Sequence, residues 1–203
     1  MKKMVGAVVF SVVLAVSVGV MGLINDSQAL EEKLIRLHVV AASDSEEDQA
    51  LKLQVRDAVL ESIRQDLREA GDVEAAKAYL QENLPKIEAS ARECLQKLGC
   101  SEEVFVGLTK EKFDRRDYEG FSLPAGIYES LRVVIGEGQG HNWWCVAYPE
   151  LCLAASSGAV ETAAEQAGLS KSLRGAMVGD YELRFFLLDL LGRLKTRGKV
   201  SFS

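Results

Sequence analysis

The sequence has 203 residues, 48% of them hydrophobic, which suits one folded domain together with a targeting segment. Its formal net charge of −6 argues against a nucleic acid partner, because an acidic surface repels phosphate backbones. Anionic lipid headgroups repel such a surface too, so we expect membrane contact only through a leader segment.

The N-terminus has the pattern of an export leader. Lys2 and Lys3 precede an uncharged apolar run from Val5 to Ile24, and Ser27-Gln28-Ala29 places small residues where a signal peptidase needs them. The run is also long enough to span ~30 Å of hydrocarbon, which is typical of an uncleaved anchor. Cleavage after Ala29 and retention as an anchor both remain open, and both place the rest of the chain outside the membrane.

A strand and two helices are expected next. Lys33–Ala41 is rich in branched residues and partly alternating, which predicts a strand. Ser43-Asp44-Ser45-Glu46 has the capping-box pattern, so a helix with one apolar face should follow it and end at Gly71. Asp72 can cap a second helix, which Pro85 should bend or restart.

The second half of the chain predicts strands, turns and then helices. We expect strands at 104–113, 129–135 and 142–148, a charged loop at 115–117, a turn at 123–126 and a short helix at 160–167. The glycine-rich segment 136–140 predicts a flexible hairpin loop; a phosphate loop would have to open a helix. Asp180 should cap a last helix, with one apolar face formed by Leu183, Phe186, Leu187, Leu190, Leu191 and Leu194 and expected to pack on the sheet.

The element order β-α-α-β-β-β-α-α predicts an α+β fold, in which helices cover a small mixed or antiparallel sheet. A hydrophobic leader helix precedes this fold. We therefore divide the chain into residues 1–29, a signal peptide or membrane anchor, and residues 30–203, an extracytoplasmic domain.

Four cysteines lie in the exported part, and they allow three pairings. Cys145 and Cys152 are the best candidates for a disulfide, because the Tyr148-Pro149-Glu150 segment between them is typical of a turn. Whether Cys94 and Cys100 are bridged or remain free thiols stays open.

Two stretches carry a resemblance to a known family. Residues 36–57 read RLHVVAASDSEEDQALKLQVRD, and residues 123–152 contain LPAG, LRVVIGEG, GHNWWCV and YPELC. Together they resemble the stage II sporulation protein R family of endospore-forming bacteria. The resemblance implies a protein without enzymatic activity or cofactor, exported from the forespore into the intermembrane space. There it would activate a membrane-embedded aspartic-type protease that leads to processing of the pro-sigma-E factor in the mother cell.

A contact surface for such a partner is expected where the first long helix starts and the last strand begins. Asp44 and Asp48 lie at the helix start, and Asn142 lies next to Trp143 and Trp144 in the strand. Alternation along a strand points one tryptophan inward and the other outward. An outward tryptophan is a good anchor, because this residue is enriched in binding hot spots.

Two chemical alternatives use the histidines. His38, Asp44 and His141 would bind zinc only if they met at one sheet end, and with no close ligand pair we expect no metal. Cys145 with a histidine base would make the chain a cell-envelope hydrolase instead. An oxidising location favours a disulfide at Cys145 over a nucleophilic thiol.

Overall fold

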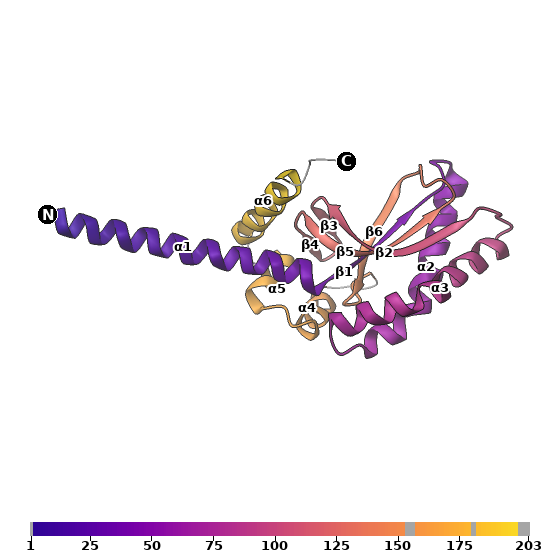
Figure 1. The fold of residues 1–203 in the computed structure, drawn as a ribbon, viewed down its shortest axis with the longest axis horizontal. Helices are drawn as coiled ribbons and strands as arrows, with labels where there is room; N and C mark the ends of the chain where they lie inside the picture. The colour runs from indigo at the N-terminus through magenta and orange to yellow at the C-terminus, as the bar shows by residue number, and fades with distance from the viewer. Residues whose placement is uncertain (1, 153–156, 180–181, 199–203) are drawn as a thin grey trace.

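The computed structural model describes residues 2–152, 157–179 and 182–198 and has the expected α+β fold (Figure 1). Within these residues, a long apolar helix precedes a four-stranded sheet, a two-stranded ribbon and five further helices. In chain order the elements are α1 (Lys2–Lys33), β1 (Ile35–Val40), α2 (Glu46–Glu69), α3 (Val73–Lys97), β2 (Val104–Phe113), β3 (Arg116–Tyr118), β4 (Phe121–Leu123), β5 (Gly126–Ile135), β6 (Asn142–Tyr148), α4 (Ser157–Gln166), α5 (Lys171–Met177) and α6 (Glu182–Gly198).

The expected hairpin between β5 and β6 is wrong, because β1 lies between these two strands. The sheet order is β2-β5-β1-β6, with β1 parallel to β5 and antiparallel to β6. β1 is buried along almost its whole length, so it needs a hydrogen-bonded neighbour on each side. The 136–140 loop crosses the end of β1 and is held there, since the backbone N–H of Gly140 donates to Ala41 O over 3.0 Å.

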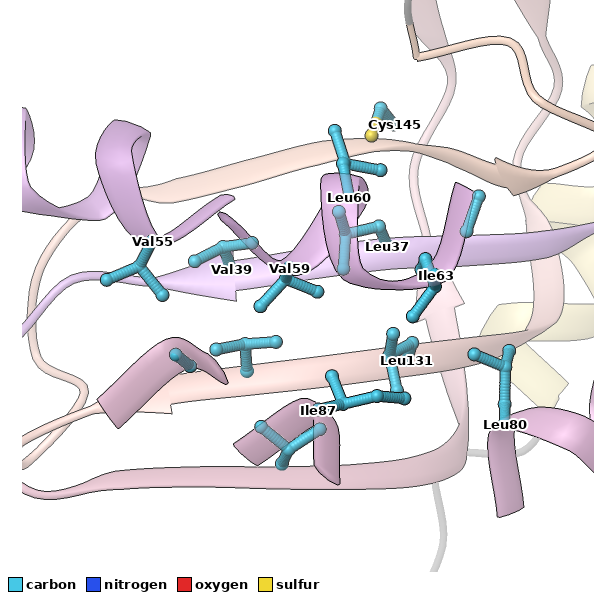
Figure 2. Close-up of a cluster of buried hydrophobic side chains, with 14 of the residues drawn as sticks. Leu37, Val39, Val55, Val59, Leu60, Ile63, Leu80, Ile87, Leu131 and Cys145 are labelled. Atoms are coloured by element: carbon cyan, nitrogen blue, oxygen red, sulfur yellow. The ribbon is translucent and has the colours of Figure 1, made fainter. Parts of the chain in front are cut away.

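The main core lies between one face of the sheet and the helix pair α2–α3. Leu37 and Val39 of β1 and Leu131 of β5 point toward Val59 and Ile87 of the two helices (Figure 2). The apolar residues of α2 recur at three- and four-residue steps, as a helix with one buried face requires. Of the two outcomes expected at Pro85, a restart of the helix is wrong, because α3 is one helix on both sides of that residue.

A smaller core lies against the opposite face of the sheet. It joins Leu30 and Leu34 at the end of α1 to Tyr128 of β5, Val146 of β6 and Phe185 of α6. The β3–β4 ribbon, α4 and α5 complete this core. The ribbon corrects the expected loop at 115–117, and α5 was not predicted, because both elements are too short to show a periodic pattern.

α6 buries a different face from the one expected. Phe185, Leu188 and Asp189 are buried, whereas most of the expected apolar face is exposed. The close approach at Gly192 explains this orientation, because a Cβ atom there would lie 1.6 Å from Ala125 O. Asp189 Oδ1 also accepts a hydrogen bond from Ala125 N over 3.0 Å. Asp180, the expected cap of this helix, lies outside the described residues.

Candidate functional site

The start of α2 and the start of β6 meet through Asp44 and His141. The carboxylate Oδ1 of Asp44 accepts the backbone N–H of His141 over 2.6 Å and lies 2.5 Å from the ring Nδ1. Both side chains are largely exposed. The structure therefore brings together two of the segments that the sequence assigned to one contact surface.

Further contacts hold this junction in place. The N-cap of α2 is Ser45, not Ser43, and Ser45 Oγ accepts from the backbone N–H of Asp48. Ser43 Oγ donates to the Asp48 carboxylate over 2.5 Å. Lys52 Nζ donates to His141 O over 3.0 Å, and its burial lowers the pKa of this ammonium despite the nearby Asp44 charge. The junction is thus a braced, partly charged surface.

Trp143 is the more exposed of the two tryptophans, although it lies on the sheet face that α2 and α3 cover. Its side chain is on the same sheet face as Cys145, at the edge strand β6, and it is 37% exposed. The guanidinium carbon of Arg56 in α2 lies 4.4 Å from the centre of its ring. A large aromatic side chain held this way presents an apolar surface with little freedom to lose on binding.

Trp144 lies on the opposite sheet face and is half-buried. His38 stacks on one side of its ring, with centroids 5.6 Å apart, and the Arg116 guanidinium carbon lies 3.7 Å from the ring centre. Trp144 therefore connects β6 to β1 and to the β3–β4 ribbon. Of the two adjacent tryptophans, Trp143 leaves the larger surface free for a partner.

His38 belongs to a polar cluster on this second face. Its Nδ1 lies 3.1 Å from the Glu111 carboxylate, and its Nε2 lies 2.9 Å from Asn142 Oδ1. Burial alone would raise the pKa of Glu111, but the hydrogen bond with His38 and the charges of His38 and Arg132 lower it overall. The sequence did not lead us to Glu111. The available signal was its position two residues before Phe113 in the predicted strand, which places both residues on the same sheet face.

Arg36 was missed as well, and it is fully buried on the same face. Its Nε donates to Cys145 O over 3.0 Å, and Nη2 donates to Tyr118 Oη over 2.5 Å. The guanidinium carbon lies 4.3 Å from the centre of the Phe113 ring. Burial lowers the pKa of Arg36, although Tyr118 and Tyr128 partly oppose this effect. Within the described part of the chain, its Nη1 has no hydrogen-bond partner.

Cys145 and Cys152 form a disulfide with a Cα–Cα distance of 5.2 Å, as the turn between them indicated. Cys94 and Cys100 are free thiols. Burial raises the pKa of Cys94, which keeps its sulfur in the less reactive thiol form. Because Cys145 is oxidised, it supplies no thiolate to the alternative hydrolase chemistry.

The expected zinc ligands do not come together. Asp44 contacts His141, whereas His38 contacts Glu111 and Asn142. Among residues 2–152, 157–179 and 182–198, no group of three or more His, Cys, Asp or Glu side chains is placed to hold a metal ion.

The apolar N-terminal segment forms one continuous helix, α1, with the residues that enter the domain. Met4–Lys33 is long and apolar enough to cross a membrane, and none of its most apolar window is buried in the fold. Such a helix is compatible with a signal sequence or with a membrane anchor.

Comparison with known proteins assigns the chain to a family. The model of the family "Stage II sporulation protein R" matches residues 31–158, which include the Asp44–His141 junction, both tryptophans and the disulfide. The chain belongs to this family, and its sequence resemblance is thereby confirmed. It is 37% identical over 128 residues to stage II sporulation protein R of Bacillus subtilis (strain 168). That alignment covers 63% of this chain and 57% of the relative. No solved structure matches significantly.

Proposed function

We propose that the chain is an exported sporulation signal that activates a membrane-embedded aspartic-type protease across the intermembrane space. The forespore would make and export the chain, and the protease in the mother-cell membrane would then process the pro-sigma-E factor. In this proposal the domain acts by contact, and its side chains make and break no bond of a substrate.

Three features support this role. Membership of the stage II sporulation protein R family connects the chain to sporulation. Helix α1 has the length and composition of a leader that exports the domain. The Cys145–Cys152 disulfide suits an oxidising compartment outside the cytosol.

The observation that carries the proposal is the exposed Trp143 at the edge of a braced surface. Asp44 and Asp48 lie at the adjoining start of α2. Asn142 precedes Trp143 and is exposed, but its side chain contacts His38 on the other sheet face. A tryptophan at the centre of an interface commonly contributes about 2 kcal/mol or more to binding. The surrounding carboxylates would orient the encounter with a cationic patch of the protease. Trp144, packed between His38 and Arg116, would support this surface from the other sheet face.

Co-expression in a non-sporulating host tests the function directly. The full chain, the candidate protease and pro-sigma-E factor are produced together, and processing is followed by the change in size of the sigma factor. We expect processing only when all three are present. Processing that is unchanged without the chain would refute the role of activator.

A pair of variants tests the contact surface in the same host. Trp143→Ala should reduce processing roughly thirtyfold, the equivalent of losing about 2 kcal/mol of binding free energy. Leu98→Ala is the matched control, because Leu98 is a similarly exposed apolar residue at 47%, placed at the end of α3. Normal processing by a folded Trp143→Ala variant would mean that Trp143 lies outside the interface. Trp143→Phe tests whether a smaller aromatic ring at this position is enough to support processing.

A further inference from the structure

α6 carries an apolar stripe that the domain leaves uncovered. Leu183, Phe186, Leu190 and Leu194 are 73%, 58%, 43% and 57% exposed. Their spacing of three, four and four residues places them on one side of the helix. The opposite side of α6 packs on the β4–β5 turn through Asp189 and Gly192, so the stripe points away from the sheet.

Polar contacts join α6 to the end of α1. Arg184 forms an ion pair with Asp26, and Lys195 Nζ lies 3.1 Å from Ser27 Oγ and 3.3 Å from the Glu31 carboxylate. Figure 1 shows α6 beside the second half of α1, with the rest of α1 projecting away from the domain. The two helices therefore form one unit at this end of the molecule.

The apolar stripe continues onto the uncovered surface of α1. Val16, Gly19, Val20 and Leu23 of α1 line a largely apolar groove together with Leu183 and Leu187 of α6. The charged residues Glu182 and Arg184 line it as well. The remaining apolar residues of α1 toward its N-terminus are exposed as well. Two exposed apolar surfaces that meet in this way are suited to the same surroundings.

We propose that α6 is an interfacial membrane helix whose apolar stripe lies in the outer leaflet of the membrane that α1 crosses. Asp26 is the first charged residue after the apolar run, so it marks the depth at which α1 leaves the hydrocarbon. Arg184 pairs with Asp26 and lies at this depth, which places Leu183 and the groove just inside the lipid. Interfacial helices bury their apolar face about 5–10 Å into the boundary in this way.

The charges of α6 fit a lipid surface better than the overall composition does. The chain as a whole is acidic, but Arg197 is exposed near the end of α6 and can meet anionic headgroups. Arg193 is exposed there too, although it pairs with Asp189 over 2.7 Å. A second copy of the chain or another protein would also cover an apolar stripe. Neither of them accounts for its continuity with a membrane-length helix.

This placement requires that the leader be retained. The expected cleavage position after Ala29 lies inside the continuous helix α1, and Leu30 and Ser27 on either side are 1% and 5% exposed. In the folded chain a peptidase therefore meets a packed helix at this point instead of an extended segment. We expect the full leader in the mature protein.

Depth-dependent fluorescence quenching tests the inference on the full chain. In a Cys94→Ser, Cys100→Ser background, single cysteines are introduced by Phe186→Cys or Leu190→Cys and labelled with a small environment-sensitive dye. The chain is then reconstituted into phosphatidylethanolamine–phosphatidylglycerol vesicles that contain lipids with brominated acyl chains. Phe105→Cys is the matched control, because Phe105 is an aromatic residue of β2 with 64% exposure, against 58% for Phe186.

We expect quenching at 186 and 190 to exceed that at 105 roughly twofold or more, as immersion of the stripe in acyl chains requires. Equal quenching at the three positions would overturn the inference. Dye spectra at 186 that depend on protein concentration and not on brominated lipid would assign the stripe to a second copy, which overturns it too. Leu194→Cys serves as a further reporter if one variant fails to fold.

Intact mass of the protein recovered from cells should include residues 1–29, and a chain cut after Ala29 is incompatible with the inference.

Discussion

Asp44 accepts the backbone N–H of His141 over 2.6 Å, although 97 positions separate the two residues in the sequence. This contact joins the segment before α2 to the segment before β6. Both segments lie beyond the end of β1, where the 136–140 loop crosses the sheet. The braced surface next to Trp143 depends on this crossing.

The first prediction concerns this contact. Asp44→Ala should lower the free energy of unfolding by about 1 kcal/mol, because a backbone donor loses a charged acceptor at a partly exposed site. Denaturant unfolding of the purified chain measures the change. Glu47→Ala, which removes another exposed carboxylate from the start of α2, should change stability by less than about 0.5 kcal/mol. Equal losses in the two variants would mean that helix-terminal charge matters more than the contact with His141.

The polar cluster around His38 predicts a pH-dependent stability. The pKa of Glu111 is lowered in the folded state, so its contribution is present above the unfolded value and is lost as the pH falls through the folded value. Glu111→Gln should therefore cost about 1 kcal/mol at neutral pH, and this cost should shrink in acid. Unfolding at pH 7 and at about pH 3 compares the two proteins. Glu103→Gln, on an exposed residue, is the control, and a Glu111→Gln cost that stays constant with pH would contradict the prediction.

Arg36 tests how a buried cation contributes to the fold. Arg36→Ala should destabilise the chain by about 3 kcal/mol, because it leaves a cavity beside Phe113 and unpairs Tyr118 Oη. Arg36→Met fills most of the volume without the desolvation of a charge, so it should remain within about 1 kcal/mol of the natural chain. Urea midpoints of the three proteins measure these differences. A Met variant as unstable as the Ala variant would assign the stabilisation to the guanidinium hydrogen bonds.

The disulfide predicts a defined thiol count. The denatured, unreduced chain should titrate two free thiols, at Cys94 and Cys100. Replacing both Cys145 and Cys152 by Ser should cost about 2 kcal/mol, the low end for disulfides, because the loop between them is short. Thermal unfolding with and without reductant measures this loss. Four reactive thiols in the purified protein would contradict the pairing and restore Cys145 as a candidate nucleophile.

Because α6 packs closely on the β4–β5 turn, a substitution at Gly192 should lower the stability of the fold. Gly192→Ala should lower the free energy of unfolding by about 1–3 kcal/mol, because the new methyl group would overlap Ala125 O. Gly158→Ala in α4 is the matched control, since a Cβ atom there meets nothing within 4 Å and alanine favours the helix. Calorimetric unfolding of both variants distinguishes them. A neutral Gly192→Ala variant would mean that α6 does not pack on this turn.

The parts of this protein that depend on local patterns could be predicted from the sequence. The apolar N-terminal helix, the α+β class, the helices α2 and α3 and the Cys145–Cys152 pairing all follow from runs of neighbouring residues. Periodicity, capping and short loops act over a few positions, so the printed sequence already contains the interactions that decide them.

The order of the strands, the partners of Arg36 and the buried side of α6 could not be predicted in this way. Each depends on which distant segments meet, as when β1 lies between β5 and β6 or Gly192 meets Ala125. Apolar residues cover more than one side of α6, so composition could not choose the side that faces the sheet. Close packing against the β4–β5 turn makes that choice, because only glycine lets the helix backbone approach so near.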